Sequence, residues 1–223
     1  MPPLFRLDLE PPFLVVRFKE PQKMLGWSTA KPGFSSATKV VWLEVHDDDL
    51  PIDVDPATFL KHKLSSRGLS EAAAFMTSRE IRRHHLAQSR IGAVVASCVT
   101  TVGLSNGEMV GAPRKQKVSH AGTINTLVHV SHPLSTGALV EVISIATQAR
   151  TVAILQTNDL RDGPPISGTG TDCIIVAAPD GEALDDCAGL HTDSGEAIGA
   201  AVYQATHAGA MAWYADIAPK EQR

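Results

Sequence analysis

The stretch "HAGTINTLV" (residues 120–128) joins glycine, threonine and asparagine directly to an apolar run of strand-forming residues. A second stretch, "SGTGTDCIIVAA" (residues 167–178), has the same arrangement. Short apolar runs rich in Val and Ile predict buried strands, and the Gly and Thr before them predict turns. Such a turn either only connects two elements of secondary structure, or it places hydroxyls and backbone N–H groups at the mouth of a site.

Patterns elsewhere in the chain predict a sheet with helices on its surface. Helical spacing covers 57–68 and 70–88, with Gly68 ending the first helix and Ser70 capping the second. Apolar residues one turn apart predict a further helix in 132–150, and small residues dominate a predicted C-terminal helix at 195–216. The remaining predicted strands are 4–10, 13–20, 38–46, 90–108, 123–131 and 172–179.

These elements predict one domain over residues 1–223, of the α/β class and α+β type. We expect a single mixed β-sheet with helices packed on its faces. With 223 residues, of which 43% are hydrophobic, the chain is long enough to bury one sizeable core.

Composition argues against several classes of partner. The net charge of -4 and the aromatic content of 5% do not fit a nucleic-acid-binding surface, which needs clustered basic and aromatic residues. The N-terminus lacks the unbroken apolar stretch of a signal peptide, and no run is long enough to predict a membrane span. Cys98, Cys173 and Cys187 are an odd number without CxxC spacing, which favours a reducing, cytoplasmic setting.

The turn "SGTGTD" (167–172) is not a phosphate-binding P-loop, because it lacks the lysine and precedes a strand. Gly168 and Gly170 give the backbone of this turn more conformational freedom. Thr169 and Thr171 present hydroxyls, and Asp172 places a carboxylate at the entrance of the strand. Two interpretations stay open: Asp172 bonds backbone N–H groups of its own turn, or the turn takes part in substrate binding or catalysis.

A second polar segment, "AGLHTDSGEAIG" (188–199), precedes and opens the C-terminal helix. Asp193 followed three residues later by Glu196 is similar to a capping box, which favours a structural role for both acids. His191 is either a general base or merely an exposed loop residue. The nine histidines show no HExxH spacing, so we expect no protein metal site, and Cys173 is most simply a small buried hydrophobe.

Three of these stretches together carry a family resemblance. They are "GTINTLVHVSHPLSTGALVEVISIATQART", "GTGTDCIIVAA" and "AGLHTDSGEAIGAAVYQA", and in order and spacing they resemble the adenosylcobinamide amidohydrolase (CbiZ) family. Looser similarity in "LGWSTAKPGFSSATKVVWLEV" and "RIGAVVASCVTTVGL" extends the resemblance over most of the chain. It implies hydrolysis of the amide between the aminopropanol arm and the corrin propionate, giving adenosylcobyric acid in corrinoid salvage.

The resemblance also implies a small-molecule corrinoid partner and no resident cofactor, since the cobalt belongs to the substrate. Amide hydrolysis needs a nucleophile or activated water, an oxyanion stabiliser and an acid for the leaving amine. Asp172 or His191 is a candidate to activate water, Asn125 to stabilise the oxyanion, and Thr169 or Thr171 to act as nucleophile. The candidates for substrate binding are Thr123, Gly168, Gly170, Gln148, Arg150 and Glu196.

One departure from the family pattern keeps two rival functions open. Where the family is expected to read Thr-Glu-Ala-Lys, this chain reads Thr147-Gln148-Ala149-Arg150. If the missing glutamate is essential, the chain is a non-catalytic corrinoid-binding protein; a second rival is an amidohydrolase acting on a different amide. The Ala- and Gly-rich last helix is also a possible contact surface between two copies of the chain.

Overall fold

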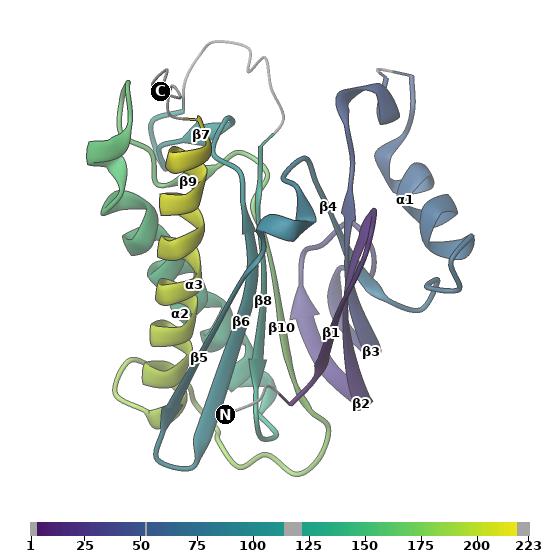
Figure 1. Ribbon diagram of the computed structural model, residues 1–223. Helices are drawn as coiled ribbons and strands as arrows, with labels where there is room; N and C mark the ends of the chain where they lie inside the picture. The colour runs from purple at the N-terminus through teal and green to yellow at the C-terminus, as the bar shows by residue number, and fades with distance from the viewer. Residues whose placement is uncertain (1–3, 52, 114–121, 218–223) are drawn as a thin grey trace.

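The computed structural model describes residues 4–51, 53–113 and 122–217. One mixed sheet dominates it, with the strand order β4–β3–β2–β10–β8–β6–β5, and β1 pairs with β2 outside this path (Figure 1). β3 and β4 run parallel, as do β8 and β10, while the other neighbouring pairs are antiparallel. The sheet strands are β1 (Arg6–Glu10), β2 (Phe13–Gly26), β3 (Gly33–Glu44), β4 (Ala73–Thr77), β5 (His85–Ile91), β6 (Val94–Val102), β8 (Ile124–Val130) and β10 (Cys173–Pro179).

Helices cover one side of each half of this sheet. α1 (Pro56–Ser65) packs near β3 and β4, whereas α2 (Thr136–Leu155) and α3 (Asp193–Ile217) lie together against the other half (Figure 1). The remaining elements are the 3₁₀ helices η1 (Asp47–Asp49), η2 (Ile81–Arg83) and η3 (Asn158–Leu160), and the short pair β7 (Gly107–Glu108) and β9 (Gly168–Thr169). The predicted α/β class and mixed sheet are therefore confirmed.

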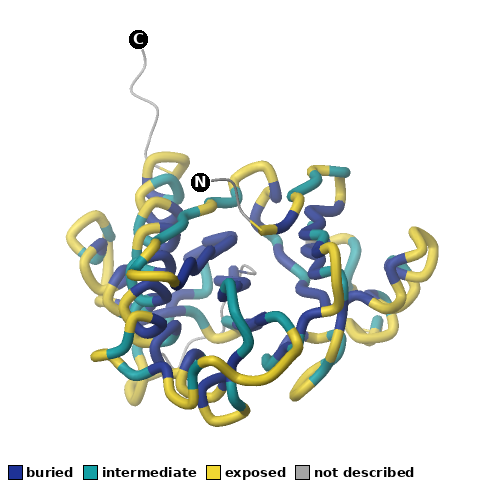
Figure 2. The backbone as a smooth tube through the Cα atoms, turned by 90° about the horizontal axis from the view of Figure 1, so that it is seen from below, coloured by how far each residue is buried: buried dark blue, intermediate teal, exposed yellow. Residues whose placement is uncertain are grey.

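The face of the sheet that α1, α2 and α3 leave uncovered is curved, so that side chains from different strands of this face pack against one another. Residues from six strands, among them Leu14, Trp42, Phe75, Leu127 and Ile175, form a single cluster, here called the inner cluster, to which η2 adds Ile81 and to which α1, α2 and α3 contribute no residue. Trp42 and Phe75 are in contact there, with ring centroids 4.8 Å apart. Buried residues accordingly follow the strands through the centre of the molecule, and exposed ones gather on loops and on the outer sides of the helices (Figure 2).

The predicted helix over 70–88 is wrong. This segment holds β4, η2 and the start of β5 instead. The run Ala72-Ala73-Ala74 suits a helix locally, but Ala73 and Phe75 pack into the inner cluster while Ala74 packs under α1 on the other face. A segment with two buried faces is more stable as a strand beside β3 than as a surface helix, so tertiary packing overrides local propensity.

Other boundaries follow the sequence more closely. α2 continues through the "TVAIL" segment to Leu155, and Ser135 caps its start by accepting a hydrogen bond from Ala138 N at 3.0 Å. By length and composition α2 is apolar enough to cross a bilayer, which the search for uninterrupted apolar runs did not indicate. Almost half of it is buried in this fold, as expected for a helix packed on a sheet and on a second helix.

The titratable side chain of His129, on β8, packs against the inner cluster and is 2% exposed. Its ring packs against Phe5 and Phe18, with centroid distances of 5.8 and 5.0 Å, and its Nε2 is 3.2 Å from Gln22 Oε1. Burial lowers the pKa of His129 to about 4, because the charged imidazolium would lose its hydration.

We therefore predict that stability falls as the pH decreases from about 6.5 towards 4. In this window the unfolded chain binds a proton at His129 and the folded chain does not, so the loss reaches about 3 kcal/mol near pH 4. Urea unfolding at several pH values measures this slope. Burial also lowers the pKa of His85, which adds its own dependence of stability on pH. The contribution of His129 is the part of the pH dependence of the unfolding free energy that is lost in His129→Leu. An unchanged pH dependence in that variant would contradict the prediction.

Candidate active site

The two Gly/Thr-rich turns meet at one edge of the sheet. β8 and β10 are parallel neighbours, with Asn125 paired to Cys173 and His129 paired to Ala177. Because parallel strands begin at the same edge, the residues that precede both strands lie side by side. The first two residues of "HAGTINTLV" lie outside the described part of the chain; Gly122 and Thr123 lie at this edge.

The carboxylate of Asp172 connects three elements at this edge. Its Oδ1 accepts hydrogen bonds from the backbone N–H of Ile124, at 3.1 Å, and from the hydroxyl of Thr169. Its Oδ2 accepts from the Thr169 backbone N–H at 3.0 Å and forms an ion pair with Arg150 Nη1 of α2 at 3.0 Å. Asp172 therefore accepts from a backbone N–H group of its own turn, as one of the two interpretations predicts, and it also accepts from the Thr169 hydroxyl and pairs with Arg150.

This ion pair is well shielded from water. The side chains of Arg150 and Asp172 are 11% and 8% exposed. Gly168 is needed for the close approach, because a Cβ added there would lie 2.5 Å from Asp172 Oδ2. Removing either charged partner would leave the other buried and unpaired, which is strongly destabilising.

Side chains of the turn enter two hollows, one on each side of the sheet edge. Thr171 and Cys173 face the inner hollow, of about 280 Å³, which lies on the same side of the sheet as the inner cluster. Thr169 and Asp172 face the outer hollow, of about 580 Å³, on the side of α2. The inner hollow is lined by Thr29, Val45, Phe75, Met76, Thr77, Ser78, Asn106, Gly122, Thr123, Asn125, Thr171 and Cys173. The outer hollow is lined by Glu108, Met109, Val110, Thr147, Gln148, Arg150, Thr151, Val152, Ser167, Gly168, Thr169 and Asp172.

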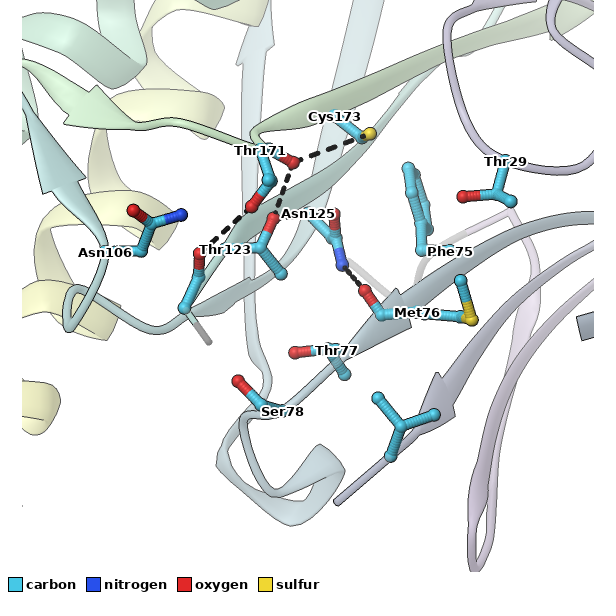
Figure 3. Close-up of a pocket in the computed structure, with 12 residues that line it drawn as sticks. Thr29, Phe75, Met76, Thr77, Ser78, Asn106, Thr123, Asn125, Thr171 and Cys173 are labelled. Carbon is cyan, nitrogen blue, oxygen red and sulfur yellow. Dashed lines mark hydrogen bonds between the residues drawn. The ribbon is translucent and has the colours of Figure 1, made fainter. Parts of the chain in front are cut away.

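Hydrogen bonds hold the polar groups of the inner hollow in place (Figure 3). Asn125 is 1% exposed, and its Nδ2 donates to Met76 O of β4 at 2.7 Å. Thr123 Oγ1 donates to Thr171 O at 2.8 Å, and Thr171 Oγ1 donates to Gly122 O at 3.0 Å. No charged residue is among the described residues that line this hollow.

The thiol of Cys173 is partly exposed in the inner hollow rather than fully buried as predicted. Burial, together with the negative charge of Asp172, raises its pKa to about 11. The thiol is therefore neutral near pH 7, and a neutral thiol is a poor nucleophile.

The outer hollow has a different chemistry, because its lining includes Glu108, Arg150 and Asp172. The Thr169 hydroxyl donates directly to the carboxylate of Asp172. Gln148, which stands where the family pattern has glutamate, is exposed, and its Nε2 donates to Ser144 Oγ one turn back along α2 at 3.2 Å.

The structure does not bring His191 and Glu196 to this site. Both are exposed near the start of α3, where Asp193 abuts Gly92 in the turn between β5 and β6. That turn lies at the opposite end of β8, since Ala96 pairs with Val130 and Val102 pairs with Ile124. The proposed capping box is also wrong, because Thr192 caps α3 by accepting from Gly195 N at 2.9 Å.

Several lining residues escaped the sequence analysis. Thr77 is the last residue of β4 and Ser78 follows it, in a segment that was predicted as a helix because of its alanine run. Asn106 and Glu108 lie at the end of the segment 90–108, which was predicted as a single strand, whereas β6 ends at Val102 and Glu108 belongs to β7. Of the sequence candidates, Asn125, Thr123 and Thr171 lie in the inner hollow, and Gln148, Arg150, Gly168, Thr169 and Asp172 lie in the outer one. Gly170 packs near the side chain of Asn106.

Comparison with known proteins identifies the family. The model of the family described as adenosylcobinamide amidohydrolase matches residues 4–218, nearly the whole chain, so the chain belongs to this family. No curated protein matches it. The chain is accordingly a hydrolase that acts on an amide bond, and its substrate is a small-molecule corrinoid.

We predict that Gly168→Ala destabilises the protein by about 1–3 kcal/mol, because the new methyl group would displace Asp172 from its donors. Gly189→Ala is the matched control, since a Cβ at Gly189 meets no atom within 4 Å. Urea unfolding measures both. Equal effects of the two substitutions would show that Asp172 is not tightly enclosed by its turn.

Proposed function

We propose that this chain, as a member of the adenosylcobinamide amidohydrolase family, cleaves the amide that joins the aminopropanol arm to the corrin propionate. The products are adenosylcobyric acid and aminopropanol, and the proposed setting is corrinoid salvage in the cytoplasm. The family match supports the class of reaction, and the contacts of the outer hollow support the assignment of residues.

One observation carries the assignment: the Thr169 hydroxyl donates to Asp172, and Arg150 holds the other oxygen of the same carboxylate. A nucleophile bonded to a base, with the base oriented by a third group, is the arrangement that activates a hydroxyl for acyl transfer. Arg150 corresponds in role to the orienting group, because its ion pair fixes the direction of the carboxylate.

In the proposed reaction Thr169 Oγ1 attacks the amide carbonyl carbon while its proton moves to Asp172. Asp172 then gives this proton to the leaving nitrogen, the C–N bond breaks, and aminopropanol departs as the amine. Asp172 then takes a proton from a water molecule that attacks the remaining ester; the bond between the acyl carbon and Thr169 Oγ1 breaks, Asp172 returns the proton to Oγ1, and the corrin carboxylic acid is released.

The dimensions of the outer hollow fit an arm better than a whole corrinoid. At about 580 Å³ it is in the range of pockets that enclose drug-sized ligands, and a corrin with its adenosyl ligand is considerably larger. Val110 and Val152, at 80% and 45% exposure, offer an apolar rim on which the macrocycle can rest while its arm enters.

We predict that Thr169→Val lowers kcat by about 10²–10³-fold, because it removes the nucleophile while keeping the side-chain shape. Thr169→Ser keeps the hydroxyl and retains most of the activity. Thr38→Val, on β3, controls for the change of side chain alone. The assay incubates metal-stripped protein with adenosylcobinamide and follows both products by mass spectrometry. Full activity in Thr169→Val would contradict the assignment of Thr169 as the nucleophile.

Gln148→Glu separates the enzyme from the degenerate binder. Because Gln148 bonds to Ser144 within α2, we expect the restored glutamate to leave turnover nearly unchanged. A large gain in hydrolysis, with tight corrinoid binding but no turnover in the natural chain, would favour the non-catalytic binding protein. Turnover of small amides without any on adenosylcobinamide would favour an amidohydrolase of different specificity.

A further inference from the structure

The inner hollow takes no part in the proposed reaction, yet it is a built polar pocket. It opens beside the catalytic turn: Thr171 lines the inner hollow, and Thr169 and Asp172 line the outer one. We propose that it binds a second, unreactive carboxamide side chain on the rim of the corrin while the outer hollow holds the arm that is cut. This inference rests on the proposed function, because it names how the same substrate is positioned.

The hydrogen-bonding groups of the inner hollow match a primary carboxamide. The hydroxyl protons of Thr123 and Thr171 are directed to backbone carbonyls, so their oxygens accept hydrogen bonds from an amide NH₂ group. Asn125 Nδ2 uses one N–H for Met76 O and has a second for the amide carbonyl.

The same lining disfavours a carboxylate. A carboxylate has no proton to donate to Thr123 and Thr171, and the described lining residues include no cation to balance its charge. At about 280 Å³ the hollow is also too small for a corrin ring and suits a short side chain. Charge, hydrogen bonding and size therefore agree on a neutral amide arm.

The sheet edge between the hollows offers a surface for the ring itself. Trp27 Nε1 donates to Asp172 O at 2.7 Å, which places the indole next to the catalytic turn, and 44% of this residue is exposed. A flat, partly exposed aromatic group gives a macrocycle apolar contact area at this position. A ring lying across the edge sends one side chain to each hollow.

Cys173 provides a direct test, because its thiol lines the inner hollow. The probe is methyl methanethiolsulfonate at mildly alkaline pH, with labelling followed by intact mass. The protein carries Cys187→Ser, which removes the exposed thiol, and Thr169→Val, which is expected to slow turnover. We expect adenosylcobinamide to slow labelling of Cys173 by about tenfold or more, millimolar propionamide to slow it measurably, and sodium propionate to leave it unchanged.

Two results would overturn the inference. Equal protection by propionate and propionamide would remove the amide preference, and protection by adenosylcobinamide without any by propionamide would mean that the ring only covers the turn. Labelling of Cys173 reports occupancy of the inner hollow whether or not the amide is cut, so a failure of the proposed reaction is distinguishable from a failure of the inner hollow.

Kinetics give the second readout in the active protein. We expect Thr171→Val to raise KM by about tenfold and to change kcat less than threefold, because it removes a binding group and no reacting atom. A corrinoid in which one rim amide is hydrolysed to a carboxylate should likewise show a raised KM and little change in kcat. A collapse of kcat in Thr171→Val would instead place the scissile arm in the inner hollow.

Discussion

The ion pair between Arg150 and Asp172 is the interaction on which the site depends. Through one carboxylate, the start of β8, the turn before β10 and the inner side of α2 are held together at the same edge of the sheet. Because the pair is shielded from water, its geometry is specified more tightly than that of an exposed salt bridge. The same carboxylate fixes the position of the Thr169 hydroxyl, which donates a hydrogen bond to it.

The curvature of the sheet explains why the edge has two chemically distinct sides. The inner face packs on itself, so the ends of β4, β8 and β10 converge with uncharged side chains around Asn125. The outer face is covered by α2, which contributes Arg150 and the charged environment of the outer hollow. Adjacent residues of one turn thus enter different environments, which allows a single segment to bind and to react.

Much of this fold is readable from the sequence, and the exceptions have physical reasons. Strands such as Ile124–Val130 and the long helix Asp193–Ile217 have strong periodicity and were predicted correctly. Ala73–Thr77 was predicted as helix because alanine favours helices locally, and its two buried faces become visible only in the tertiary structure. The same alternation rule that identifies strands could have separated Asp172 from Thr171. The distance of His191 from the turn depends on strand direction and order, which local patterns do not encode.

The most direct measurement of the central claim is a crystal structure of the Thr169→Val variant with adenosylcobinamide bound. The account predicts that the carbonyl carbon of the scissile amide lies in the outer hollow, about 3–3.5 Å from the side chain of residue 169, with Asp172 still paired to Arg150. A scissile amide seated in the inner hollow, or near the start of α3 beside His191, would contradict it.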